Sequence, residues 1–597
     1  DLPLSRGLGD VYKRQLSNET NMSRLTRFSD ESELTTYRIA VSGNGQFTQY
    51  HGGTVEAGLA AINTILTGLN FITETDIGIH LELVANNDLV VYLDSDTDPF
   101  DDSLSGANSA LQQTLNSVIG TENYDIGHLF SGVGGGGNAG AIGSVCSNST
   151  KGSAWSASSN PLGPRFVNLV AHEVGHQLGA NHTFSFNSEG TGVNVDPASG
   201  TTIMSYAGTG FDDIAAYADN YYHNVSIGQA LSYLKSQTCN VDSDNGNAVP
   251  VVAPMPDYSI PIGTPFVLTG SATDEDADDS LTYVWEQVDD GVVTSDDFGP
   301  YNTQGANFRS LFPTTSPSRY FPNLTSVRSG NLTLSNPSGG DTYETLSLVP
   351  RSFNFALTVR DNATGGGGVA STTSTVDVID NGGIFSVTSQ DIGNVYIAES
   401  ARVVTWDVAG TDQAPISTSS VNISMSVDGG RTYPYLLAES VPNTGSYEVV
   451  MPDVVTVRAR IKVSAVDNVY YSINSQAFSV TRDDIVLTVD RLDYGVCQAD
   501  SVQSNILYET STRFSDTAIF RAENLPSGMD VSFDPPAASE HNTDVTLTFS
   551  ASADLNAETY PVDVVAESSQ RSQSLTYQIQ VFPRTDFEEV NLSLPLN

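Results

Sequence analysis

The stretch VAHEVGHQLGANH, residues Val170 to His182, contains three of the eight histidines in this 597-residue chain, together with one glutamate and two glycines. On a helix, His172 and His176 are four residues apart and point the same way, so both imidazoles can reach one metal ion. The apolar residues in and around the stretch recur at helical spacing and predict a helix with one buried face: Phe166, Val167, Leu169, Val170, Val174 and Leu178.

The residues after this predicted helix supply a third candidate ligand. Gly179 lies where the helix has to end, and glycine readily adopts the positive φ of a chain reversal, which would return His182 to the first two histidines. Three neutral histidines leave one position of a zinc ion free for water, as in catalytic rather than structural sites. Glu173 can accept a proton from that water and pass it to a leaving group. The pattern therefore predicts a hydrolytic zinc centre on His172, His176 and His182.

These residues resemble the zinc signature HExxHxxGxxH of the metzincin metallopeptidases, and TTIMSYAG at 201–208 resembles their Met-turn. The resemblance implies an α/β catalytic domain with one Zn²⁺ that hydrolyses peptide bonds. It also implies that Met204 packs beneath the ligands and that Tyr206 can approach the metal or the oxyanion. A tyrosine that only packs or faces solvent is the alternative for Tyr206. Thr183 departs from the pattern, because relatives of the adamalysin type usually have Asp there.

A glycine-rich segment upstream, YDIGHLFSGVGGGGNAGAIGSVC at 124–146, resembles the metzincin segment that ends in a substrate-binding edge strand. The resemblance implies that residues 139–144, including Ala139, Gly140, Ala141 and Ile142, pair with an extended peptide through backbone hydrogen bonds. The glycine run alone indicates only a flexible loop.

The three cysteines, Cys146, Cys239 and Cys497, are too few for a fold built on disulfides. The residues alone leave open either one pair or three free thiols. DNYYHNVSIGQALSYLKSQTC at 219–239 resembles the closing helix of the reprolysin-like branch, which implies a bridge from Cys146 to Cys239. That bridge would close a loop of roughly 90 residues and contribute about 4 kcal/mol.

The pattern of apolar residues divides the chain into an α/β part and an all-β part. Residues 36–239 alternate between strand-like and helix-like stretches, with 88–94 read as a strand, and predict one α/β domain. Short apolar alternations then predict three Ig-like sandwich modules at 248–381, 384–482 and 485–582. The length of the first predicts an inserted loop between Asp296 and Asp341. Residues 36–482 resemble large secreted bacterial zinc metalloproteases with Ig-like modules.

The two ends of the chain are expected to lie outside these domains. Residues 1–15, DLPLSRGLGDVYKRQ, resemble a translated sequencing adapter and are excluded from the fold. We expect residues 16–35 to be the remnant of a pro-segment or linker, with the signal segment missing. Residues 583–597 are expected to be a linker or a truncated next domain.

The charge of the chain limits its partners. With 25 Lys+Arg against 70 Asp+Glu, the net charge is −45 and the pI is near 4.1. Such a chain repels nucleic acid and anionic membranes, and no run of 18 apolar residues predicts membrane insertion. Composition and resemblance together predict a secreted, extracellular or cell-surface protein; an acidic surface that only confers solubility is the alternative. Nothing in the sequence indicates the oligomeric state.

A second candidate metal site lies in ATDEDADDSLTYVWEQVD at 272–289, which resembles PKD-type and cadherin-like loops. Clustered carboxylates suit Ca²⁺, and Asp274, Asp276 and Asp278 are the predicted ligands. A solvated acidic loop is the alternative.

The residues and the resemblance together predict a secreted zinc-dependent endopeptidase that acts on protein or peptide substrates. One alternative is an adhesion or protein-binding array with a catalytically silent metzincin domain, although the intact Glu173 argues against it. A zinc hydrolase that acts on a non-peptide bond is another, and the expected substrate-pairing strand disfavours it.

Overall fold

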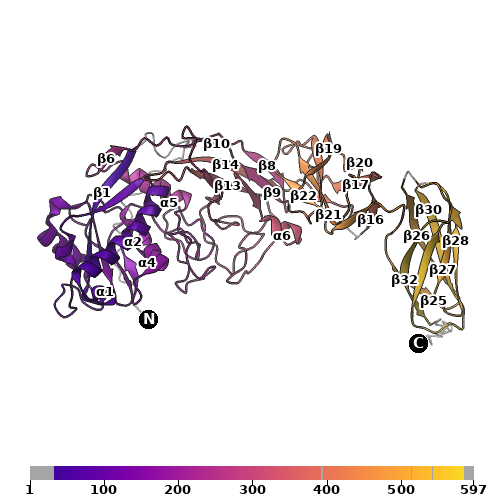
Figure 1. Cartoon of the computed structure of the whole chain (residues 1–597), viewed down its shortest axis with the longest axis horizontal. Helices are drawn as coiled ribbons and strands as arrows, with labels where there is room; N and C mark the ends of the chain where they lie inside the picture. Colours follow the sequence, from indigo (N-terminus) through magenta and orange to yellow (C-terminus); the bar gives the residue numbers. More distant parts are fainter. Residues whose placement is uncertain (1–32, 391–393, 512–513, 541, 584–597) are drawn as a thin grey trace, which may run out of the picture.

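The computed structural model describes residues 33–390, 394–511, 514–540 and 542–583. The expectations for residues 1–15, for most of 16–35 and for 584–597 lie outside the described residues. Figure 1 shows an elongated molecule in which the chain runs from an α/β domain at one end, through β-rich parts, to a group of long strands at the other end.

The α/β domain is built on a mixed sheet of six strands in the order β2-β1-β3-β5-β4, with β6 also paired to β1. β1, β2, β3 and β5 are parallel, whereas β4 and β6 run antiparallel to their partners. The sheet extends past the predicted domain end at 239, because β6 returns to β1. The strands are β1 (Glu33–Gly43), β2 (Ile79–Leu83), β3 (Ile126–Ser131), β4 (Gly135–Asn138), β5 (Ala154–Ser158) and β6 (Val241–Asp244).

Both faces of this sheet are covered by helices. Side chains of a strand alternate between faces, so Ile39 and Val41 of β1 join the core formed with α2 and α4, whereas Ala40 joins the core formed with α3. By length and composition alone α2 qualifies as a membrane-crossing helix, but its buried side is part of the first core. The helices are α1 (Gly45–Tyr50), α2 (Val55–Asp76), α3 (Ala107–Leu115), α4 (Gly163–Gln177) and α5 (Asn224–Leu234).

The strand predicted at 88–94 is absent. Asn87–Val90 form a 3₁₀ turn, and Val91 makes only an isolated bridge to Gly43. The side chain of Asn87 accepts from the N–H of Val41 and donates to its carbonyl, both at 2.8 Å. An amide side chain thus takes the backbone hydrogen bonds that another strand would have used.

The β-rich part begins with a four-stranded sheet, β11-β13-β14-β8, and two strand pairs, β12-β9 and β10-β7. Long loops flank β12, including the region predicted as an insertion. Their residues Val293, Phe298 and Tyr343 form a small core with Ala198 and Ile214 of the α/β domain. The elements are β7 (Val251–Val252), β8 (Tyr258–Pro261), β9 (Phe266–Thr269), β10 (Ala272–Thr273), β11 (Thr282–Gln287), β12 (Ser318–Phe321), α6 (Leu324–Arg328), β13 (Arg351–Arg360) and β14 (Val369–Ile379).

The following strands pair as β15-β17-β20 and β16-β23-β21-β18-β19, with β22 on β21. One hydrophobic core runs from Val249 to Val480 and crosses the predicted boundary at 381–384, where Phe385 packs on Tyr470 at 5.0 Å between ring centroids. The strands are β15 (Ser386–Val387), β16 (Val395–Ile397), β17 (Ala401–Asp407), β18 (Ser420–Ser426), β19 (Tyr435–Pro442), β20 (Ser446–Val450), β21 (Thr456–Ala465), β22 (Tyr471–Ile473) and β23 (Phe478–Thr481).

The last strands form two sheets, β24-β26-β30-β28 and β25-β32-β31-β27-β29, around a core of their own. This separate core contrasts with the continuous one before it. The strands are β24 (Ile485–Val489), β25 (Asp493–Cys497), β26 (Ser501–Thr510), β27 (Ala518–Glu523), β28 (Met529–Asp534), β29 (Ala537–Ala538), β30 (Thr543–Ala551), β31 (Thr559–Glu567) and β32 (Ser572–Phe582).

Buried polar contacts join the α/β domain to β11 and β13. The guanidinium of Arg360 lies 2.6 Å from the carboxylate of Asp76, and both side chains are buried. The carboxylate of Glu286 accepts the backbone N–H of Asn224 at 2.9 Å. The two parts therefore meet at a buried interface.

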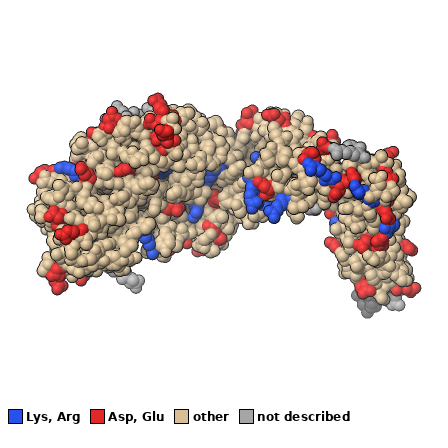
Figure 2. All heavy atoms as spheres, viewed as in Figure 1, with Lys and Arg blue, Asp and Glu red and all other residues tan. Residues whose placement is uncertain are grey.

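On the surface, acidic groups are scattered over the visible face and basic groups are fewer (Figure 2).

Candidate metal centre

Helix α4 carries two of the predicted ligands and the predicted base. His172, Glu173 and His176 are buried on it, and Gly179, with φ 105°, reverses the chain directly after the helix. His182 follows this turn. One ring nitrogen of each histidine lies within 4.8 Å of the others, so the structure brings the three predicted ligands together.

Hydrogen bonds determine which ring nitrogen of each histidine faces the shared space. The Nδ1 atoms of His172 and His176 lie 2.7 and 2.8 Å from the backbone carbonyls of Ile203 and Ala180. Nδ1 of His182 lies 2.9 Å from a carboxylate oxygen of Glu189. Because these oxygens only accept, each Nδ1 carries the proton and each Nε2 keeps its lone pair.

The short distance between two of these Nε2 atoms indicates that the site is suited to a cation. Nε2 of His176 and Nε2 of His182 are 3.0 Å apart, and two unprotonated nitrogens repel at that distance unless a cation lies between them. Burial, with the neighbouring His182, lowers the pKa of His172 to about 3, which keeps its imidazole in the neutral, metal-binding form. The residues therefore fit a zinc ion bound by three histidines.

The carboxylate of Glu173 is enclosed between α4 and β4. Burial raises its pKa to about 8, and the backbone N–H of Ala139 donates to it. A Cβ at Gly137 would lie 2.3 Å from its Oε1. A glycine at this position of β4 is therefore what gives the carboxylate its space.

The segment predicted to pair with a substrate does not form a strand. The edge strand of the sheet is β4 at Gly135–Asn138, whereas residues 140–142 lie in bends. The segment leaves the sheet because Gly140 and Gly143 have φ of 71° and 70°, and because the N–H of Gly143 donates to the carbonyl of His176 at 2.8 Å. Ala139, Gly140, Ala141 and Ile142 thus connect the sheet edge to the end of α4.

Met204 and Tyr206 both lie at the histidines. Met204 is fully buried, and a Cβ at Gly175 would lie 2.4 Å from its sulfur, so the helix turn between the ligands packs directly on it. The ring of Tyr206 is centred 4.6 Å from that of His182 and 5.8 Å from that of His172. The position of Tyr206 is compatible with its predicted approach to the metal.

Two acidic residues near the third ligand were missed by the sequence analysis. Glu189 bonds His182, and Asp196 is fully buried and accepts hydrogen bonds from the hydroxyls of Thr183 and Thr202 at 3.0 and 2.6 Å. Adamalysin relatives usually have an Asp at the position of Thr183. In this protein a buried carboxylate next to that position comes from Asp196 instead. Neither acid lies in a motif, because the loop between 184 and 198 has no periodic pattern.

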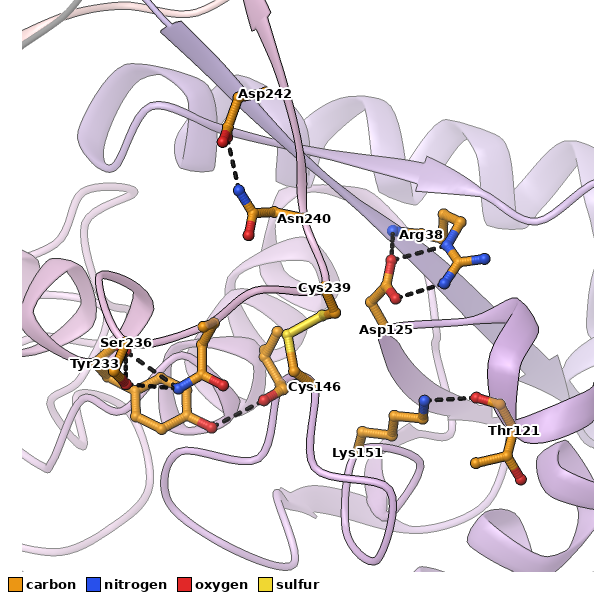
Figure 3. Close-up of a disulfide and its surroundings, with 12 residues drawn as sticks. Arg38, Thr121, Asp125, Cys146, Lys151, Tyr233, Ser236, Cys239, Asn240 and Asp242 are labelled. Carbon is orange, nitrogen blue, oxygen red and sulfur yellow. Dashed lines mark hydrogen bonds and ion pairs between the residues drawn. A yellow bond between two sulfur atoms is a disulfide. The ribbon is translucent and has the colours of Figure 1, made fainter.

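Cys146 and Cys239 form a disulfide, with Cα atoms 5.7 Å apart (Figure 3). It ties the turn after the glycine-rich segment to the chain that leaves α5. The hydroxyl of Tyr233 on α5 donates to the carbonyl of Val145 at 2.9 Å beside the bridge. Cys497 is free and exposed.

The acidic loop at 272–289 assembles a different set of carboxylates from the predicted one. Asp274, Asp279 and Asp361 bring carboxylate oxygens within 4.8 Å of one another. Asp276 instead accepts the backbone N–H of Ala248 at 2.7 Å, and Asp278 is exposed. Asp361 follows β13, far away in sequence, so spacing within one loop did not reveal it.

The α/β domain matches a known protein family. The model of the reprolysin-like branch of metallo-peptidase family M12B matches residues 34–234, the segment that contains the sheet, α4 and the three histidines. Residues 34–234 form a reprolysin-like metallopeptidase domain. The family is zinc-dependent, and the histidine cluster of this reprolysin-like domain fits a zinc site.

The part after the reprolysin-like domain is β-rich, and the solved structures that match this chain include those of immunoglobulin-domain proteins. A structure of Dpr2 Ig1-Ig2 with DIP-Theta Ig1-Ig3 is 9% identical, covers 56% of this chain and 100% of its own, and has a TM-score of 0.14. The N-terminal eight Ig domains of Down Syndrome Cell Adhesion Molecule are 10% identical, at 56% and 42% coverage and TM-score 0.14. The titin M3 domain is 17% identical, at 16% and 97% coverage and TM-score 0.12. No curated protein matches the chain.

Proposed function

We propose that this protein is a secreted zinc endopeptidase that hydrolyses peptide bonds of protein substrates, with Glu173 as general base. The observation that carries the proposal is that one ring nitrogen each of His172, His176 and His182 lies within 4.8 Å of the others, with the buried Glu173 on the same helix as the first two. The match of residues 34–234 to a metallopeptidase family supports the peptide bond as the target.

The chain's own residues divide the work of hydrolysis. Held by the three histidines, a zinc ion would polarise the substrate carbonyl and lower the pKa of a water molecule. Glu173 takes up the proton that the water loses and delivers it to the leaving amine. The backbone N–H of Ala139 donates to the carboxylate of Glu173 and orients it for both steps.

The test compares casein cleavage by the zinc-loaded protein and its Glu173→Gln variant, with zinc content measured for both. We expect the variant to bind zinc and to cleave about 10²–10⁴-fold more slowly, because only the proton acceptor is lost. Glu122→Gln, at an exposed position of the same domain, is the matched control. If wild type binds zinc but cleaves nothing in casein or a broad peptide library, the adhesion function takes its place.

We further propose a Ca²⁺ site on Asp274, Asp279 and Asp361. One oxygen each of Asp274 and Asp279 is enclosed and has no hydrogen-bond partner, and three carboxylates this close repel one another without a cation. Millimolar Ca²⁺ should raise the unfolding temperature of wild type and not that of Asp279→Asn, with Asp278→Asn behaving as wild type. Equal responses in all three proteins would contradict the site.

The proposed location outside the cell is supported by the disulfide between Cys146 and Cys239, since such bonds persist in oxidising compartments. The excess of acidic over basic groups among the charged residues is compatible with it (Figure 2).

A further inference from the structure

The three candidate ligands are not held equally. His172 and His176 stand on α4, and backbone carbonyls hold their Nδ1 atoms. His182 lies beyond the helix, and its Nδ1 is held by the side chain of Glu189 at 2.9 Å. Both partners of this pair are partly exposed, with side-chain exposures of 16% and 34%. The orientation of His182 therefore depends on where the loop places Glu189.

The buried side chain of Asn194 closes the loop that carries Glu189. Its Oδ1 accepts the N–H of Glu189 at 3.3 Å, and its Nδ2 donates to the carbonyl of Phe184 at 2.6 Å. Asn194 is 1% exposed. It thus connects the residue that holds His182 to the chain that directly follows His182.

The β-rich part holds Asn194 in turn. The carboxylate of Asp290 accepts the N–H of Asn194 at 2.8 Å, and the N–H of Gly291 donates to the backbone carbonyl of Asn194 at 3.1 Å. Three residues on, Val293 exchanges backbone hydrogen bonds with both arms of the loop: its N–H donates to Ser185, and its carbonyl accepts from Ala198. Segment 290–293 therefore runs between the two arms of the loop.

We propose that Glu189 is a positioning residue for the third zinc ligand and that the β-rich part, through Asp290 and Asn194, positions Glu189. The proposal rests on the proposed zinc peptidase function and deepens it. A carboxylate on the second nitrogen of a ligating histidine fixes its orientation and raises its basicity, and its loss weakens metal binding by about 10–100-fold. The β-rich part thereby contributes to the metal affinity of a centre to which it supplies no ligand.

The test measures zinc affinity of the full chain by chelator competition, without substrate. Glu189→Ala should bind zinc about 10–100-fold more weakly. Glu189→Gln should recover part of this loss, because its amide oxygen still accepts from His182. Asp290→Ala should weaken zinc binding in the same direction, whereas Asp296→Ala, at an exposed position of the same loop, should not. The d–d spectrum of the cobalt-substituted protein should change in the Glu189 and Asp290 variants only.

The double variant tests whether the two residues act in series. Because Asp290 acts through Glu189, Glu189→Ala/Asp290→Ala should bind zinc no more weakly than Glu189→Ala alone. Additive losses would overturn the link, as would wild-type affinity in Glu189→Ala. The unfolding temperature of each zinc-free variant separates weakened binding from misfolding. Asp290→Asn, which keeps the acceptor oxygen, should bind zinc as wild type does, and weakened binding in this folded variant would overturn the role of the acceptor. If wild type binds zinc tightly but cleaves no peptide, only the proposed function fails.

Discussion

Gly137 shows how a position without a side chain makes room for Glu173, the proposed general base. The strand β4 passes so close to Glu173 that a methyl group on Gly137 would overlap the carboxylate. Glu173 is enclosed from the sheet edge as well as by its own helix, which is why burial raises its pKa.

We predict that Gly137→Ala slows casein cleavage by about 10²-fold, because it displaces the carboxylate by about 1 Å, while zinc content stays that of wild type. Gly135→Ala in the same strand is the control, since a Cβ there meets nothing within 4 Å. Initial rates and zinc content of the three proteins check this. Equal rates for the two variants would mean that β4 does not restrain Glu173.

His128 predicts a pH dependence of stability. It is fully buried between Gln177 and Ser156, and burial lowers its pKa from 6.5 to about 4. The unfolded state therefore binds more protons between these values, so this contribution is fully present above pH 6.5 and is lost as pH falls toward 4. At pH 5 it should be about 2 kcal/mol smaller than at pH 7.

Urea unfolding of wild type and His128→Gln at pH 7 and pH 5 checks the prediction, with both proteins in the same zinc state. The variant lacks the titrating group, so its stability should fall with pH by about 2 kcal/mol less than that of wild type. Parallel pH profiles would show that His128 titrates normally in the fold.

At the residue scale, the sequence predicted the groups that stand on a periodic element. His172, Glu173 and His176 could be predicted because helical spacing alone places them together. Glu189 and Asp196 could not be predicted, because they lie in a loop whose path is set by contacts with residues 290–293. No local pattern encodes such contacts.

Among elements, α2 and α4 were predictable because their apolar residues recur at helical intervals over several turns. The strand expected at 88–94 failed because Asn87 satisfies the backbone of Val41. The edge strand was predicted too late in the chain, because a run of glycines has no alternation of side chains that would show where a strand begins and ends. Strong periodicity predicts elements, and long-range hydrogen bonds can override weak periodicity.

The disulfide is the covalent link between elements, and its sequence separation is 93 residues. Opening it restores that loop's freedom to the unfolded chain, so Cys239→Ser should lower the free energy of unfolding by about 4–5 kcal/mol. Cys497→Ser should leave it unchanged, because Cys497 is free and exposed. Urea unfolding of both variants checks this, and similar stabilities would argue against a structural role for the bridge.

For the whole molecule, the joint between the α/β domain and the β-rich part predicts which truncations survive. A chain that ends at residue 247 leaves Asp76 without Arg360 and the Asn194 loop without Asp290. The truncation also uncovers Ala198 and Ile214, which pack against Val293, Phe298 and Tyr343 in the full chain. We expect this chain to aggregate or to bind zinc more weakly than the full chain.

A chain that ends at residue 483 should keep wild-type zinc affinity and casein cleavage within about two-fold, because the strands it removes have their own core. Size-exclusion chromatography, chelator competition and cleavage assays compare both truncations with the full chain. A monomeric 247-residue truncation with full zinc affinity would contradict a shared interior.

The sequence by itself determined the α/β domain, the β-rich remainder, the helix that carries the site and the three histidines with their glutamate. These follow from local periodicity and from the spacing of chemically distinctive side chains. Only the tertiary structure decided that Glu189 holds His182, that β4 encloses Glu173, that Asp361 joins Asp274 and Asp279, and that one core runs from Val249 to Val480. Each of these depends on pairing between segments far apart in the chain, where packing and burial, not local pattern, select the partners.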